Sequence, residues 1–470
     1  YNTNIGANVL GYIAEVNNSI IEKDDYYLMG DLIGKQGVEI SYEEELRGIK
    51  GIKFIQKDRF NRDVGSFKNG ELDIIPIAGK DLTITIDSEL QDYGEQLMNG
   101  KKGGIVAIDP RNGEILSLVS APSYNPNLLI GRNRSENYME LYRDSIYKPL
   151  IDKSLLNMHA PGSPFKILVG LSALQENVIS EKTSIFCNNY YQYGREKRTM
   201  QCHCGGGHRN LTNAISLSCN SYFANAYRKT IDTKSPTKEA FNNWSNQMKS
   251  FGLGEYLNND LSVGKKGIIP DFEFYNKWYP DFKWGATTTL SNSIGQGEVL
   301  VTPIQLANMT AAIANKGYYY TPHIIKKIEG SEIDSKFKTK NYTLIDSTHF
   351  EPIIEGLSKV YKSGTAQFLQ VPEIEICGKT GTAENFTKIN GKKTQLTDHS
   401  IFVAFAPKDN PTIAISVLVE NGYYGSRWAG RIASLMIEKY IKGEVTLKNM
   451  EQLVMNKSLD EEYQLSLIHI

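Results

Sequence analysis

The sequence His159-Ala-Pro-Gly-Ser-Pro-Phe-Lys166 places a serine and a lysine three residues apart at the start of an apolar segment. His159–Gly162 is typical of a turn, and Pro164 suits the first position of a helix. Residues 165–177 have apolar side chains at helical spacing, which predicts a helix with Ser163 at its N-terminus. Because residues three apart share a helix face, we expect Lys166 within reach of the Ser163 hydroxyl.

The surroundings of this pair favour nucleophilic chemistry. Lys166 is expected to be buried, and burial lowers a lysine pKa, so its neutral amine could take the serine proton. Free N–H groups at the helix N-terminus would favour negative charge developing at Ser163. The alternative is a capping serine with a solvent-facing lysine. That alternative is preferred for the other Ser-x-x-Lys matches, at Ser145, Ser235, Ser262 and Ser335.

A second motif, Ser218-Cys-Asn220, lies between two segments with helical character. A serine hydroxyl and an amide close to the nucleophile could pass a proton to a leaving group and hold a peptide backbone. The alternative is an ordinary turn between helices, since Ser and Asn are common turn residues. Taken alone, this motif favours an ordinary turn over a catalytic role.

The third motif, Lys379-Thr-Gly-Thr382, lies in a segment that alternates like a strand, and Lys-Thr-Gly occurs only here. Gly378 and Gly381 permit close approach of the backbone to a ligand. On an edge strand, Lys379 and Thr382 can bind a carboxylate, and the Thr382 N–H can join that of Ser163 as an oxyanion hole. Further strands are expected at residues 398–407 and 412–419.

Composition is that of a soluble globular chain longer than one ordinary domain: 470 residues, 40% hydrophobic and 22% charged. The 52 basic and 53 acidic residues nearly cancel, which argues against a nucleic-acid binder. No segment approaches the ~18–20 uninterrupted apolar residues of a membrane span, and none is typical of a signal peptide.

The three motifs, in this order, resemble the active-site set of the class B penicillin-binding proteins. The resemblance is greatest to the elongation-type penicillin-binding protein 2 family, the peptidoglycan D,D-transpeptidases of cell-wall elongation. It extends over nearly the whole chain, including the segments Gly11–Val16, Gly30–Glu39, Tyr42–Gly48, Ala107–Ser117 and Gly295–Ala307.

The resemblance implies a role for each motif residue. Ser163 would be the acylated nucleophile, with Lys166 as its base, and Ser218 and Asn220 would relay a proton and contact the substrate amide. The carboxylate-binding strand would be formed by Lys379, Thr380, Gly381 and Thr382. The implied reaction attacks the D-Ala–D-Ala bond of a peptidoglycan stem peptide and transfers the acyl group to an amine of a neighbouring stem. β-Lactams would acylate Ser163, and catalysis would need no cofactor.

The implied fold is α+β: an antiparallel sheet flanked by helices, with a helical subdomain and a partial, β-rich N-terminal pedestal. We expect the pedestal at residues 1–77, the transpeptidase domain at 78–447, and a charged tail with little pattern at 448–470. Tyr1 opens inside family-like sequence. An N-terminal membrane anchor absent from this chain is therefore expected, with the enzyme at the periplasmic, extracytoplasmic face of the cytoplasmic membrane.

Clustered cysteines suggest a second site. Cys187, Cys202, Cys204 and Cys219 lie close in sequence, with His203 and His208 among them. Disulfides are the default in an exported protein, but the Cys-x-Cys spacing with interleaved histidines favours a structural Zn²⁺. The resemblance implies a ligand set of Cys187, Cys202, His208 and Cys219, with Cys204 and His203 as alternates. A Cys187–Cys202 disulfide or free thiols remain open.

Other functions remain open at this point. A D,D-carboxypeptidase or β-lactamase would share the three motifs and differ in the access of water to the ester. A penicillin-binding sensor or an inactive scaffold belongs to a different class, and intact motifs argue only against the scaffold. The resemblance also implies a membrane glycosyltransferase of the elongation machinery as partner. The acceptor amine and the oligomeric state are not determined by the sequence.

Overall fold

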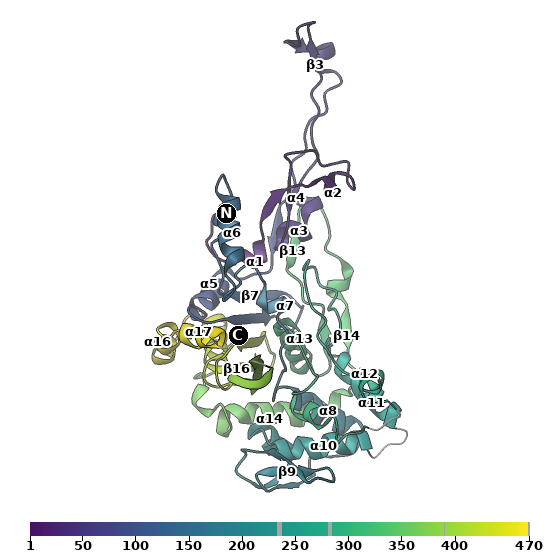
Figure 1. The fold of residues 1–470 in the computed structure, drawn as a ribbon, viewed down its shortest axis with the longest axis vertical. Coiled ribbons are helices and arrows are strands. Elements are labelled where there is room, and N and C mark those ends of the chain that lie inside the picture. Colours follow the sequence, from purple (N-terminus) through teal and green to yellow (C-terminus); the bar gives the residue numbers. More distant parts are fainter. Residues whose placement is uncertain (233–236, 281–283, 390, 469–470) are drawn as a thin grey trace.

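The structure is a computed structural model that describes residues 1–232, 237–280, 284–389 and 391–468. Its centre is a five-stranded antiparallel sheet with the strand order β15-β16-β17-β6-β7 (Figure 1). The strands are β6 (Gly103–Ile108), β7 (Ile115–Ala121), β15 (Cys377–Ile389), β16 (Lys392–Ala406) and β17 (Ile413–Val419). The strand of the third motif and the strands predicted at residues 398–407 and 412–419 are therefore present in one sheet.

The sheet joins two distant parts of the sequence, because β17 pairs with β6 from Val419↔Gly103 to Ala414↔Ile108. Helices cover both of its faces, and every residue of β6 and β17 is buried. On one face, α5 (Ser88–Leu97) packs against β7 and α15 (Ala429–Lys442) packs against β17, whereas α13 (Pro303–Ala314) packs against β6 and β17. Burial on both faces explains why these strands are almost continuously apolar.

A mainly helical subdomain lies between β7 and β15 in the sequence. Its longer helices are α8 (Phe165–Gln175), α9 (Leu211–Ser216), α10 (Asn220–Asp232), α11 (Thr237–Lys249), α12 (Phe272–Trp278) and α14 (Phe350–Ser363). α8 is buried from Phe165 to Leu174 and packs against α10, α11 and α14. This packing fixes the end of α8 that carries Ser163.

Short strands that the sequence did not predict interrupt the subdomain. β8 (Ile185–Cys187) pairs with β11 (Gly207–Arg209), and β9 (Tyr190–Tyr193) pairs with β10 (Arg198–Gln201). These pairs carry three of the clustered cysteines and deliver the chain to α9. The remaining elements around the sheet are α6 (Arg134–Arg143), α7 (Lys153–Leu156), β12 (Tyr318–Tyr320), β13 (Ile325–Ile328) and β14 (Lys340–Tyr342).

The N-terminal part is built from short elements and a long projection. Its elements are α1 (Ala7–Leu10), β1 (Ile13–Glu15), α2 (Asn18–Ile21), β2 (Leu32–Gly34), α3 (Gly37–Ser41), α4 (Glu43–Leu46), β3 (Ile55–Lys57) and β4 (Asp63–Ser66). Bridges Ile49↔Ile77 and Ile52↔Ile74 hold the two sides of the projection together, with β3 near its tip (Figure 1). β5 (Leu82–Ile84) then pairs with β13 and leads into the body of the molecule.

The C-terminal segment differs from the patternless tail expected from the sequence at residues 448–470. It forms α16 (Lys448–Met455) and α17 (Asp460–Ile468), and only residues 469–470 lie outside the described part. Tyr463 is buried and holds the segment in place, because its hydroxyl accepts from the Lys102 N–H (2.7 Å) and donates to the Glu420 carbonyl (3.1 Å). Apolar contacts add to this attachment, because Val454 is buried and Leu447 and Met450, on the same face of α16, pack against the core. Within the described residues, no helix combines the length and apolarity needed to span a membrane.

Candidate active site

Ser163 lies in a tight turn immediately before α8. The backbone bonds Phe165 N–H to Gly162 O (3.0 Å) and Lys166 N–H to Ser163 O (3.1 Å) hold it against the helix N-terminus. Gly162 has a φ of 62°, and a Cβ at this position would lie 2.5 Å from the Thr382 carbonyl oxygen. Glycine is required here both for the left-handed backbone and for the lack of space. The turn therefore packs directly on β15.

Lys166 points from the first turn of α8 into a closed environment, with 1% of the residue exposed. Its Nζ donates to the Ser218 carbonyl (2.8 Å), to the Ser218 Oγ (3.1 Å) and to the Asn220 Oδ1. Burial lowers the pKa of Lys166 to about 8. A lysine with this pKa is partly neutral close to physiological pH, which is the state that a general base requires.

Ser218 occupies the turn that ends α9. The N–H of Ser218 donates to the Ile215 carbonyl (3.1 Å), and the next N–H donates to the Ala214 carbonyl (2.8 Å). Ser218 has a φ of 55°, which is uncommon for a residue with a side chain and typical of helix ends and functional sites. Its Oγ lies 2.9 Å from the Ser163 Oγ.

These contacts form a continuous path of proton-carrying groups. The Ser163 hydroxyl contacts the Ser218 hydroxyl, which in turn contacts the Lys166 amine. The sequence predicted that Lys166 acts on Ser163 directly, whereas the hydrogen bonds of the structure pass through Ser218. Because hydroxyl hydrogens can reorient, this path can carry a proton from Ser163 to a neutral Lys166.

The third motif lies on β15, at the edge of the sheet. Its side chains alternate: Lys379 and Gly381 are buried, whereas Thr380 and Thr382 are partly exposed. The two threonines therefore share the open face of the strand. A Cβ on Gly381 would lie 2.6 Å from the Cδ of Pro164, so the strand contacts the nucleophile turn at this point as well.

Lys379 places its amine behind this open face. Its Nζ donates to the Thr380 carbonyl (3.1 Å) and lies 3.4 Å from the Thr380 Oγ1. Burial, followed by the charge of Lys166, lowers the pKa of Lys379 well below its usual value. A bound carboxylate would reverse this shift, because an opposite charge stabilises the protonated form.

One segment outside the motifs, the loop at Gly295 and Gln296, also holds the site together. The Gly162 N–H donates to the Gly295 carbonyl (2.8 Å), and the Gln296 Nε2 donates to the Thr382 carbonyl (2.9 Å). The loop around Gly295 thus bridges the nucleophile turn and β15. The sequence assigns this loop no role beyond the family resemblance. Its glycines were the available signal for a close backbone contact.

The cysteine cluster lies beside the second motif. The Sγ atoms of Cys187, Cys202, Cys204 and Cys219 lie within 4.8 Å of one another, and all four residues are buried. All of the cysteines are free, so the structure has no Cys187–Cys202 disulfide. The Asn220 N–H donates to the Cys202 Sγ (3.1 Å), and the Asn220 Nδ2 donates to the Gln201 carbonyl (2.7 Å). The cluster therefore positions a residue that contacts Lys166.

The expected ligand set needs one correction. His208 lies on the opposite side of its strand pair, exposed, with its ring 5.1 Å from that of Phe186. The register explains this, because Gly207 pairs with Cys187 and His208 pairs with Phe186. Neighbouring strand residues face opposite ways, so a strand that directs Cys187 inward directs His208 outward. Cys204, expected only as an alternate, takes its place, and the exposed His203 is not part of the cluster.

The donor set fits zinc. Tetrahedral ligands at a Zn–S distance of about 2.3 Å are about 3.8 Å apart. The Cys202 and Cys219 Sγ atoms are 3.7 Å apart, and those of Cys204 and Cys187 are 3.5 Å apart. Burial raises the pKa of the Cys187 thiol, and zinc binding would require this thiol to lose its proton.

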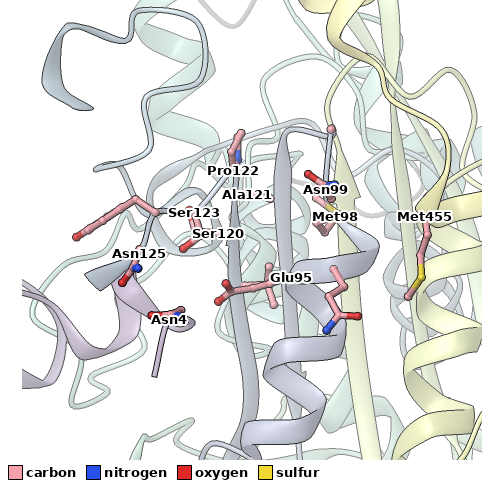
Figure 2. Close-up of a pocket in the computed structure, with 14 residues that line it drawn as sticks. Asn4, Glu95, Met98, Asn99, Ser120, Ala121, Pro122, Ser123, Asn125 and Met455 are labelled. Atoms are coloured by element: carbon pink, nitrogen blue, oxygen red, sulfur yellow. The ribbon is translucent and has the colours of Figure 1, made fainter. Parts of the chain in front are cut away.

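A separate cavity of about 480 Å³ lies at the other edge of the sheet (Figure 2). It lies between the end of β7 at Ser120 and Ala121, the α5 residue Glu95, and Met455 of α16. β7 and β15 are the two opposite edge strands of the sheet. The cavity is therefore distinct from the three motifs.

Comparison with known protein families gives two matches along the chain. The family described as the penicillin binding protein transpeptidase domain matches residues 103–438, and the penicillin-binding protein dimerisation domain matches residues 1–84. The first match contains all three motifs and the cysteine cluster.

Individual relatives agree with the family matches. The peptidoglycan D,D-transpeptidase MrdA of Acinetobacter baumannii is 34% identical, over 89% of this chain and 62% of its own length. The crystal structure of Pseudomonas aeruginosa PBP2 in complex with WCK 5153 is 31% identical with a TM-score of 0.77, over 94% of this chain and 90% of that chain. PBP2 in complex with MreC from Helicobacter pylori is 27% identical with a TM-score of 0.77, over 94% and 79% of the two chains. The chain thus spans less than two thirds of the length of the MrdA relative.

Proposed function

Because this chain belongs to the penicillin-binding protein transpeptidase family, we propose that it is a peptidoglycan D,D-transpeptidase that crosslinks stem peptides through an ester on Ser163. The observation that carries the proposal is the hydrogen-bonded path from Ser163 through Ser218 to the buried Lys166. This path supplies a nucleophile and a base, and β15 beside it supplies an edge for an extended peptide.

Substrate binding is assigned to the open face of β15. The hydroxyls of Thr380 and Thr382 would receive the terminal carboxylate of a D-Ala–D-Ala stem, with the Lys379 charge behind them. The carbonyl of the scissile bond would lie between the N–H groups of Ser163 and Thr382. Two backbone donors stabilise the oxyanion that forms when the carbonyl is attacked.

Acylation then proceeds in two proton transfers. Neutral Lys166 takes the Ser163 proton through Ser218, and the Ser163 Oγ attacks the carbonyl carbon to form a tetrahedral oxyanion. As the oxyanion collapses, the same path returns a proton to the leaving nitrogen, and the terminal D-Ala departs as a free amino acid. The acyl group remains as an ester on Ser163.

Deacylation completes the crosslink. The amine of a neighbouring stem attacks the ester carbonyl and gives its proton to the Lys166 path, and the Ser163 oxygen leaves with a proton. The products are a new amide bond and free Ser163. A hydrolase would use water in place of the amine.

The proposal includes a structural zinc held by Cys187, Cys202, Cys204 and Cys219. Bound zinc would supply a crosslink between the strand pairs and the start of α10 and would take no part in the chemistry. Support comes from the spacing of the sulfurs and from the hydrogen bond between the Asn220 N–H and the Cys202 Sγ.

Partners and location follow from the relatives. A Helicobacter pylori PBP2 is solved in complex with MreC, and the projection at residues 49–77 offers exposed apolar side chains for contacts of this kind. We assign the chain to the elongation machinery, with a membrane glycosyltransferase as a further partner. Its place would be the periplasmic face of the cytoplasmic membrane. The proposed boundaries remain a pedestal at 1–77, a transpeptidase domain at 78–447 and a C-terminal segment at 448–470.

Incubation of the protein with a stem pentapeptide donor and a tetrapeptide acceptor, followed by mass spectrometry, tests the proposed function. A transpeptidase gives D-Ala and a crosslinked dimer in equal amounts. A D,D-carboxypeptidase gives D-Ala and a free tetrapeptide, and a sensor gives neither product while still forming a penicillin adduct. A β-lactamase releases that adduct within seconds, which would also contradict the proposal.

A further inference from the structure

Thr365 belongs to none of the three motifs, but it contacts two of the segments that carry them. It lies in the turn after α14, where its N–H donates to the Ser216 carbonyl (3.2 Å). Ser216 is the last residue of α9 and lies two residues before Ser218. On its other side, the Thr365 Oγ1 lies 2.9 Å from the Thr380 Oγ1 of β15.

The position of Thr380 makes this contact relevant to substrate binding. Thr380 is on the open face of β15, and its Oγ1 also lies 3.4 Å from the Lys379 Nζ. A hydroxyl has one proton to donate and two lone pairs to accept with. If Thr365 and Lys379 donate to the Thr380 oxygen, the Thr380 proton is directed outward to the face where a carboxylate would bind.

We propose that Thr365 is a positioning residue that orients the Thr380 hydroxyl toward the carboxylate of the substrate and ties this hydroxyl to the end of α9. The inference rests on the proposed function and deepens it, because it adds a residue to the carboxylate site. Thr365 acts through Thr380 and makes no bond to the reacting atoms. Its removal should therefore weaken recognition of the carboxylate and leave the acylation chemistry intact.

The test compares two probes that differ only in the carboxylate: benzylpenicillin and benzylpenicillin methyl ester. The second-order acylation rate constant is measured for both probes on the wild type, Thr365→Val, Thr365→Ser and Thr339→Val. Valine keeps the shape of threonine and removes the hydroxyl, whereas serine keeps the hydroxyl. Thr339 is the matched control, because it is exposed, belongs to none of the motif segments, and its hydroxyl also makes one hydrogen bond, to the Ser335 carbonyl (3.0 Å).

For Thr365→Val we expect a loss of about tenfold with benzylpenicillin, the size typical of one hydrogen bond to a charged group, and a loss below about twofold with the methyl ester. Thr365→Ser and Thr339→Val should stay within about twofold of the wild type for both probes. Separate titration of binding and acylation should place the loss in the binding constant.

Equal losses with the two probes would overturn the inference, because they would show a general disturbance of the site. Unchanged rates in Thr365→Val would overturn it as well. If Thr365→Val does not fold, Thr365→Ser takes its place in the test. Serine keeps the hydroxyl, so a Thr365→Ser variant that no longer reacts faster with benzylpenicillin than with the methyl ester would overturn the inference. A wild type that reacts with neither probe would contradict the proposed function itself, and that outcome is visible before any Thr365 variant is compared.

Discussion

The first and third motifs and the cysteine cluster are both groups of reactive side chains, but they are held in different ways. Ser163 lies in the turn that leads into α8, Lys166 lies in the first turn of that helix, and Lys379 lies on an edge strand of the central sheet. Three of the four clustered cysteines lie on short strands and the turns between them, and the fourth precedes α10. On a helix or a strand, the spacing of residues in the sequence predicts which side chains lie on the same face. In a loop, the path of the backbone decides which side chain faces inward.

This difference explains which features could be predicted from the sequence. The α+β fold and the family were predictable, because the strands, the helix of Ser163 and the motif order are encoded by apolar periodicity and by spacing. The sequence does not reveal that His208 pairs with Phe186 and so lies apart from the four clustered cysteines.

Two other features were invisible for different reasons. The helix α16 has a short apolar stripe at Leu447, Met450 and Val454, which the many charged residues around it obscure in the sequence, whereas Tyr463 attaches α17 through hydrogen bonds that no sequence pattern indicates. Gln296 and Thr365 act by single hydrogen bonds across segments distant in sequence, and no local pattern indicates such contacts. Hydrogen bonds between segments so far apart in the sequence can be identified only from the folded structure.

Among the variants of the motif residues, removal of the proposed base should have the largest effect on the rate of acylation. Lys166→Ala removes the proposed base, and we expect acylation by benzylpenicillin to slow by about 10²–10⁴-fold. Stopped-flow measurement of adduct formation checks this. Lys182→Ala, which alters an exposed lysine, is the control and should leave the rate unchanged. A loss below about tenfold in Lys166→Ala would assign the base elsewhere.

For the cysteine cluster, the most informative variants are Cys204→Ser and His208→Ala. Cys204→Ser removes a proposed ligand, and we expect zinc affinity to fall by more than the about 10–100-fold that loss of an outer partner costs. Metal analysis and native mass spectrometry measure bound zinc, and thermal melting should show a lower Tm. His208→Ala should keep one zinc and its melting temperature. Loss of zinc from His208→Ala, with zinc retained in Cys204→Ser, would instead support the ligand set expected from the sequence.

The pH dependence of acylation distinguishes the two lysines of the site. Lys166 must be neutral to accept a proton, and burial lowers its pKa to about 8, so the rate should rise about tenfold per pH unit below that value and then level. Lys379 must be protonated to attract the carboxylate, and burial lowers its pKa, so the rate should fall again at higher pH.

A bell-shaped profile with benzylpenicillin is therefore expected. The descending limb should be weaker with the methyl ester, which has no carboxylate for Lys379 to attract. A flat profile between about pH 6 and 10 would contradict both roles.

The smallest effect concerns the bridge between the nucleophile turn and β15. Gln296→Ala removes the bond from Nε2 to the Thr382 carbonyl (2.9 Å). One neutral hydrogen bond contributes about 0.5–1.5 kcal/mol, so we expect acylation to slow by about 2–12-fold with little change in Tm. Gln367→Ala, at an exposed glutamine, serves as the control. A rate equal to the wild type would show that the turn and the strand are held by backbone contacts alone.

The central claim is that the motifs converge on Ser163 as the acylated nucleophile. Intact-protein mass spectrometry after brief exposure to benzylpenicillin tests it most directly, on the wild type and on Ser163→Ala, followed by peptide mapping of the adduct. We predict one stable adduct per chain, located on Ser163 and missing from Ser163→Ala. An adduct of equal yield in Ser163→Ala, or a wild type that gains no mass, would contradict this claim.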